Sequence, residues 1–174
     1  MSTIRLTALL VAFIGVPALC VASQAWAQQK YPISRATAHA QYLQEHAIDV
    51  GDVAGHRVRV FEIRYDYPQH DYALAGVPVQ QTFSRCMSDY VNQSGSFTCY
   101  AVYMLEDGNK VFSRTSGTTQ SNSAGGLKLI FVENFMGGTG KFKGMRGQLH
   151  GAGERASGAN SLTQATSGEY WIEE

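Results

Sequence analysis

The sequence predicts an all-β domain whose antiparallel strands follow one another in hairpin order, as a sandwich or an up-and-down barrel. Three observations support this prediction. Segments rich in Val, Ile, Phe, Tyr and Thr recur from about residue 56 onward. Turn sequences such as Asp107-Gly108 separate them at short intervals. No long linker or internal repeat divides the series, so the spacing indicates one domain of seven or eight strands.

The N-terminus is typical of a secretory signal peptide. Arg5 supplies the positive charge, an apolar run extends over residues 6–22, and Ala25-Trp26-Ala27 forms a small-residue cleavage site. An uncleaved membrane anchor is the weaker alternative because Pro17 interrupts the run. We therefore expect a secreted or periplasmic protein, cleaved after Ala27, with no membrane span in the mature chain.

Charge gives no reason to expect a polyanionic partner. The 174 residues include 14 basic and 14 acidic side chains, so the formal net charge is zero. A nucleic-acid-binding chain normally carries an excess of Lys and Arg. We accordingly expect no nucleic-acid partner.

The elements follow in order along the chain. Residues 28–54 are expected to be a lead that contains a short helix over residues 34–47, where Ser34 can cap a segment rich in Ala, Gln and Glu. Residues 55–174 are expected to form the barrel domain. Its clearest strands are predicted at 57–67, 77–91, 96–105, 110–120 and 127–135, with further strands in 135–153 and 161–174.

The segment 96–105 favours a barrel over a sandwich. Alternation assigns Phe97, Cys99 and Tyr103 to one face and Tyr100 and Val102 to the other, so both faces are largely apolar. An antiparallel sheet with one wet face alternates more cleanly. One side would be the barrel interior, and the other would contact a helix or a second subunit.

Cys86 and Cys99 are the two cysteines that remain after signal cleavage. An even pair in an oxidising compartment predicts a structural disulfide. A redox-active pair is the less favoured alternative because the C-x-x-C spacing is absent.

The stretch from residue 135 to 153 holds seven of the eighteen glycines. It is not a phosphate-binding loop, because Phe142 follows Gly140-Lys141 where a hydroxyl residue is required and Phe135 occupies the place of the first glycine. Gly137, Gly138 and Gly140 instead predict a sharp corner between two strands.

Within this stretch, "GGTGKFKGMRG" (137–147) resembles the glycine-rich signature of the dirigent and allene oxide cyclase-like barrels. The resemblance covers about residues 55–172 and is close only over the motif. It implies an eight-stranded antiparallel up-and-down barrel, often a homotrimer, with an apolar cavity open at one end. It also implies catalysis without metal or organic cofactor, by shaping a small hydrophobic or aromatic substrate.

The resemblance and the strand phase name three candidate catalytic residues. Arg146 belongs to the motif and is expected to reach the cavity or, equally, to form an ion pair at the rim. Asp66 ends the first barrel strand, where dirigent proteins place an acid, although the alternative of a solvated outer face shared with Glu62 and Arg64 is favoured. Glu133 is in phase with Phe131 and would serve as general acid or base near the cavity mouth, although the alternative of a solvated strand-end carboxylate is favoured.

Four aromatic residues are candidates for substrate binding: Tyr65, Tyr100, Tyr103 and Phe131. They would line the pocket, or serve as ordinary core aromatics. The five histidines have no zinc-site spacing, so no metal is expected. The sequence thus favours a cofactor-free isomerase, cyclase or lyase-like enzyme. A non-catalytic dirigent-like or lipocalin-like binding module and a structural protein remain as alternatives.

Overall fold

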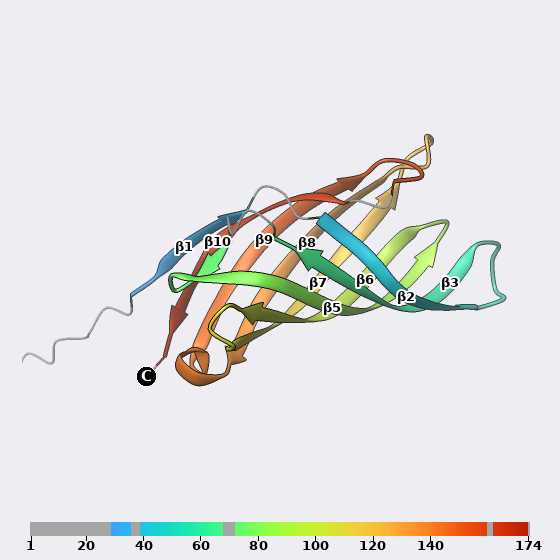
Figure 1. Ribbon diagram of the computed structural model, residues 1–174. Coiled ribbons are helices and arrows are strands. Elements are labelled where there is room, and N and C mark those ends of the chain that lie inside the picture. Colours follow the sequence, from blue (N-terminus) through green and yellow to red (C-terminus); the bar gives the residue numbers. More distant parts are fainter. Residues whose placement is uncertain (1–28, 36–38, 68–71, 160–161, 174) are drawn as a thin grey trace, which may run out of the picture.

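The computed structural model describes residues 29–35, 39–67, 72–159 and 162–173 (Figure 1). The segment that resembles a signal peptide, 1–27, lies outside these residues. The described chain is almost entirely antiparallel β-structure, which confirms the predicted fold class. No helix among the described residues is long and apolar enough to cross a membrane.

Ten strands form the sheet, and one 3-10 turn interrupts them. Their bounds are β1 Tyr31–Arg35, β2 His39–Asp49, β3 His56–Asp66, β4 Ala73–Leu74, β5 Val77–Val91, β6 Ser94–Leu105, β7 Lys110–Ser121, β8 Leu127–Gly138, η1 Gly140–Phe142, β9 Met145–Arg155 and β10 Thr163–Ile172. The order is β1-β10-β9-β8-β7-β6-β5-β3-β2, with β4 paired to β5 only. From β5 to β10, each strand pairs with the next one along the chain, as hairpin order requires.

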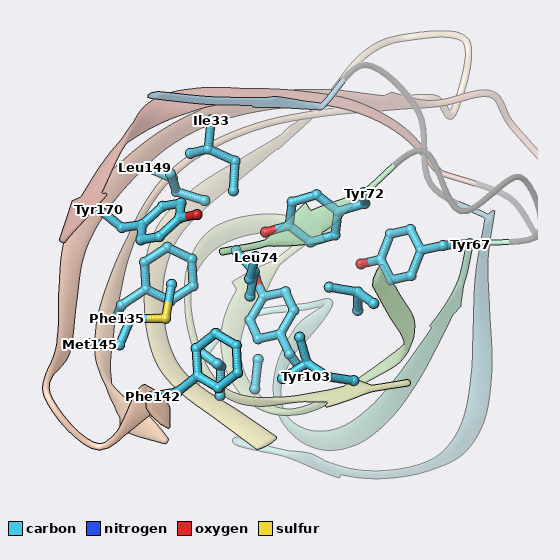
Figure 2. Packing of buried hydrophobic residues seen from close by; sticks show 14 residues of the cluster. Ile33, Tyr67, Tyr72, Leu74, Tyr103, Phe135, Phe142, Met145, Leu149 and Tyr170 are labelled. Carbon is cyan, nitrogen blue, oxygen red and sulfur yellow. The ribbon is translucent and has the colours of Figure 1, made fainter. Parts of the chain in front are cut away.

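The sheet curls into a ring around its apolar face (Figure 2). Its end strands, β1 and β2, do not pair with each other among the described residues, but only residues 36–38 separate them in the chain. The strand count exceeds the expected eight for two reasons. β4 is only two residues long, and β1 and β2 pair with different partners, β10 and β3.

The helix predicted over 34–47 is not formed: the described residues of this segment belong to β1 and β2. Helix propensity is a weak prior, whereas β3 presents an edge that β2 pairs from Asp66 to Arg57, with one register shift between Tyr42 and Gln44. Cross-strand side-chain contacts reinforce this pairing. Arg59 Nη2 donates to Glu45 Oε2 over 2.6 Å, and Gln44 Nε2 donates to Glu62 Oε2 over 3.0 Å.

Tight turns connect the central strands where the sequence predicted them. Asn92 and Gln93 have positive φ values of 51° and 65° and join β5 to β6, which is the conformation that a two-residue hairpin needs. Gly108 has φ +80° in the β6–β7 turn, where Asp107 Oδ1 accepts the backbone N–H of Asn109. These local signals explain why most strand boundaries were predictable.

The glycine stretch forms a corner, as predicted. β8 ends at Gly138, η1 follows at Gly140–Phe142, and β9 begins at Met145. Gly140 has φ +53°, and a Cβ on Gly138 would lie 2.3 Å from the carbonyl oxygen of Lys110. The glycines therefore let the backbone pack closely while the turn directs Phe142 into the barrel, where it is fully buried.

One end of the barrel is closed by a cluster of aromatic and aliphatic side chains (Figure 2). Tyr72 and Leu74, from the β3–β5 connection, enter the ring and meet side chains from the strands. Tyr72 lies near Tyr103, with 6.0 Å between ring centroids, and Phe135 lies near Tyr170 at 6.1 Å. This end is therefore packed, so any free interior space lies beyond it.

The predicted disulfide is present. Cys86 on β5 and Cys99 on β6 are direct cross-strand partners with Cα atoms 4.0 Å apart, and they are bonded. Both face the interior of the barrel. The bridge therefore links two neighbouring strands in the barrel wall.

The two apolar faces of the β6 segment have different surroundings. Cys99, Ala101, Tyr103 and Leu105 are buried in the interior. On the outer face Tyr100 is 55% exposed, and the described residues include no helix that could cover it. Contact with a second subunit stays a prediction.

Candidate functional site

A narrow cavity of about 100 Å³ lies inside the barrel beyond the packed end. Its walls are mostly apolar and come from eight strands, β2, β3 and β5 to β10, with the disulfide as part of the lining. Representative wall residues are Ile63, Tyr65, Phe97, Leu129 and Phe131. This volume is below the roughly 300–1,000 Å³ usual for drug-sized ligands, so the cavity suits a molecule with one ring or a short chain.

Glu133 is the acidic residue of this cavity. Alternation along β8 turns Phe131, Glu133 and Phe135 inward together, and Glu133 is only 4% exposed. Its Oε1 accepts hydrogen bonds from the hydroxyl groups of Tyr103 and Ser113, which are themselves buried. The sequence expectation that Glu133 faces the interior agrees with this geometry, and the alternative of a solvated strand-end carboxylate does not.

The surroundings of Glu133 explain how a carboxylate is accommodated in an apolar interior. An isolated buried charge is very costly, whereas one that accepts strong hydrogen bonds is tolerated. Both observed donors go to Oε1, so Oε2 remains the acceptor to which neither hydroxyl is bound. A further polar pair, Tyr67 and Thr82, lines the same cavity and is hydrogen-bonded over 3.1 Å. Such a site can accept a proton from a bound molecule and return it.

Three of the four predicted substrate-binding residues line the cavity: Tyr65, Tyr103 and Phe131. Tyr100 does not. It lies on the outer face of β6, where the Arg114 guanidinium carbon is 5.5 Å from its ring centroid. Residues three apart in a strand point to opposite faces, so Tyr100 and Tyr103 could not both face the interior.

Arg146 lies outside the cavity, so the expectation that it reaches the interior is wrong. Its neighbours Met145 and Gly147 are the inward positions of β9. The guanidinium donates to the carbonyl oxygens of Met136 and Met145 over 3.0 and 2.9 Å, and Nε lies 3.4 Å from a carboxylate oxygen of Glu173. The rim ion pair considered from the sequence is the observed arrangement.

Asp66 is also directed away from the cavity. It accepts hydrogen bonds from Gln81 Nε2 over 2.9 Å and Arg64 Nε over 3.1 Å. The outer-face interpretation favoured for Glu62, Arg64 and Asp66 is therefore the observed arrangement. Of the three predicted catalytic residues, the structure places only Glu133 in the cavity.

The cavity mouth contains residues that the sequence reasoning did not select. Arg59 and Arg155 both line it, together with Tyr42 and Tyr90. Arg59 could have been found from its strand phase, because it shares the inward face of β3 with Phe61 and Ile63. Arg155 carried the same signal, because it ends β9 in phase with the inward positions Met145 and Leu149.

Tyr90 stays a neutral phenol at this mouth. Burial raises the pKa of Tyr90, and the hydrogen bond with Thr119 opposes that shift only in part. Its hydroxyl lies 2.8 Å from Thr119 Oγ1. The aromatic wall thus continues to the mouth without adding negative charge.

The described residues contain no group of three or more His, Cys, Asp or Glu side chains that could hold a metal ion. No protein-family model matches the chain, and no curated protein matches its sequence.

A solved structure does match in fold. The pterocarpan synthase dirigent protein GePTS1 is similar to this chain with a TM-score of 0.51 and 10% sequence identity. The match covers 84% of this chain and 94% of that protein. The chain therefore has a dirigent-like barrel fold, in agreement with the resemblance seen in the glycine-rich motif.

Proposed function

We propose that this chain is an exported barrel protein that binds a small, largely apolar or aromatic molecule and acts on it as a cofactor-independent isomerase or cyclase. Glu133 would be its proton-transfer group. The observation that supports the proposal is one buried carboxylate, bound by Tyr103 and Ser113, in the wall of a mostly apolar cavity.

The chemistry open to such a group is proton transfer. As a general base, Glu133 removes a proton from one atom of the ligand, and as a general acid it returns the proton to another. The bonds of the ligand rearrange between these steps with no net change in atoms or electrons. Tyr103 and Ser113 stabilise the ionised carboxylate, and the apolar wall excludes competing water.

A non-catalytic binding module that steers chemistry generated elsewhere is the second candidate. The positions of Arg146 and Asp66 outside the cavity favour it, because only one of the three expected catalytic groups remains inside. GePTS1 is described as both a synthase and a dirigent protein. Its likeness is compatible with either candidate.

Export is proposed on two grounds. The disulfide between Cys86 and Cys99 suits an oxidising compartment, and the first 27 residues have the layout of a cleavable signal. We also propose a homotrimer, because the outer face of the sheet exposes Val60, Met87 and Tyr100, which another subunit would cover.

The test begins with native mass spectrometry of protein purified from its own host. We expect a trimer that carries a small molecule. That molecule is then incubated with the protein in D₂O, and deuterium incorporation is followed by mass spectrometry. Wild type and the outer-face control Tyr100→Phe are expected to incorporate deuterium at similar rates. In Glu133→Gln the rate of incorporation is expected to fall about 10²–10⁴-fold.

The outcomes separate the candidates. Binding without exchange in any variant would identify the binding module rather than the enzyme. If no molecule co-purifies and the small apolar probe 4-phenylbutan-1-ol does not bind in calorimetric titration, a ligand-binding role of the cavity is excluded.

A further inference from the structure

We propose that the ligand is an amphipathic organic carboxylate whose acid group is held at the cavity mouth by Arg155 and Arg59 while its apolar part occupies the cavity. The inference rests on the proposed function, because it requires a ligand in the cavity. It adds the chemical class of that ligand, its orientation and the residues that select it.

The mouth leads directly into a second, outer hollow. Tyr42, Arg59, Tyr90 and Arg155 border both the cavity and this hollow, which also reaches Arg57 and the β5–β6 turn. The hollow is lined by three arginines and a single carboxylate, that of Glu45. A molecule that enters the cavity therefore passes a cationic entrance, which attracts anions.

The arginines differ in how far their charge is already compensated. Arg57 Nε lies 3.2 Å from Asp49 Oδ1, and Arg59 Nη2 lies 2.6 Å from Glu45 Oε2. Within the described part of the chain, no carboxylate pairs with Arg155 and no group accepts a hydrogen bond from it. Arg155 is thus a half-buried cation at the mouth whose counter-charge is not supplied by these residues.

Arg59 contributes an unused donor at the same place. Its Nε is buried and, among the described residues, has no hydrogen-bond partner. Buried donors are almost always paired, so an orphaned one calls for an explanation. A carboxylate oxygen at the mouth would accept this hydrogen bond while Nη2 keeps its bond to Glu45.

Aromatic rings orient both guanidinium groups. The Arg155 guanidinium carbon is 5.9 Å from the centroid of Tyr42, and that of Arg59 is 5.0 Å from Phe61. Stacking on a ring leaves the N–H edges of a guanidinium available, and these edges match the two oxygens of a carboxylate. The pair is therefore suited to an organic acid group rather than to a neutral hydroxyl.

The deep end of the cavity fixes the direction of binding. Glu133 lies in the wall there at 4% exposure and would repel a second carboxylate in the same apolar space. The acid of the ligand is thus excluded from the interior and attracted to the mouth. The cavity of about 100 Å³ leaves room for one ring or a short chain as the apolar part.

The test compares two probes that differ only in the head group, 4-phenylbutanoate and 4-phenylbutan-1-ol, by calorimetric titration at neutral pH. We expect wild type to bind the acid about tenfold more tightly than the alcohol. Added salt should lower the affinity for the acid and not the affinity for the alcohol. Arg155→Gln should remove this tenfold preference by lowering the affinity for the acid, while Arg155→Lys should keep part of it. The matched control is Arg114→Gln, since Arg114 stacks on the outer-face ring of Tyr100 and lies outside the cavity.

Alcohol binding reports on the cavity and on folding in every variant, so it separates the two proposals. If neither probe binds wild type, the proposed ligand-binding function fails. If the alcohol binds as tightly as the acid, or if Arg114→Gln and Arg155→Gln lower acid affinity equally, the cavity still binds ligands but the carboxylate site is wrong.

Discussion

Single residues distinguish the packed end of the barrel interior from the cavity beside it. Phe142 enters from the glycine corner and is fully buried among apolar side chains. Glu133 lies farther along the same interior and is held by two hydroxyl groups. The first residue supplies stability and the second supplies the candidate chemistry, so substitutions at the two sites should have separable effects.

Phe142→Ala is expected to lower the free energy of unfolding by about 3–5 kcal/mol, because it removes a fully buried ring and leaves a cavity. Equilibrium denaturation in urea measures the loss. The control Phe112→Ala changes a half-buried ring on β7 and should cost clearly less. Equal losses in the two variants would show that Phe142 does not anchor the closed end.

At the site, strand phase predicted more than motif resemblance did. Period-two alternation put Glu133 on the same face as Phe131, and both line the cavity, although a solvated carboxylate was the favoured interpretation of Glu133. Arg146 was misplaced because a glycine motif records how the backbone bends and does not determine which face a neighbouring side chain takes. Tyr100 was misplaced because it was selected as an aromatic residue, although alternation already assigned it to the face opposite Tyr103.

At the scale of elements, a charged clamp joins the β2–β3 loop to β5. His56 begins β3, with Nδ1 2.6 Å from Asp52 Oδ1 and Nε2 2.7 Å from Asp89 Oδ1. The hydrogen bond with Asp89, followed by that with Asp52, raises the pKa of His56 above its ordinary value of 6.5. The imidazolium is therefore better stabilised in the folded chain than in the unfolded one.

A raised folded pKa sets the sign of the pH dependence. The stabilisation from His56 is fully present below pH 6.5 and is lost as the pH rises through the folded value. In thermal melts between pH 5.5 and 9, wild type should lose more stability toward high pH than His56→Gln does. His150→Gln, which changes an exposed histidine on β9, should behave like wild type. Parallel curves for wild type and His56→Gln would contradict this assignment.

Elements were predictable where local chemistry decided them. The limits of β5 and the start of β8 match the prediction because turn-forming residues flank them in the sequence. The helix expected over 34–47 failed because Ala, Gln and Glu favour a helix only when no strand edge is available. Pairing with β3 is a long-range interaction, and no local window of sequence contains it.

At the scale of the whole molecule, the barrel wall is covalently joined beside the cavity. The Cys86–Cys99 bridge ties β5 to β6 and lines the ligand space. The free energy of unfolding of the double variant Cys86→Ser/Cys99→Ser should be about 2–4 kcal/mol lower than that of wild type, because the bridge restricts the unfolded chain. Denaturation of both proteins with and without reductant measures this. A reductant effect of equal size in the double variant would show that the bridge is not its cause.

The order of the strands also has a consequence for how the barrel assembles. Every strand from β5 to β10 finds its partner within the next hairpin, but β1 pairs with β10, where Tyr31 lies opposite Tyr170. Chains are synthesised from the N-terminus, so the earliest strand to emerge must wait for the last one before it can dock. The β1–β10 pairing can therefore form only after the C-terminal strand has been synthesised. A nascent chain that stalls before β10 would leave the edge of β9 exposed to other strands.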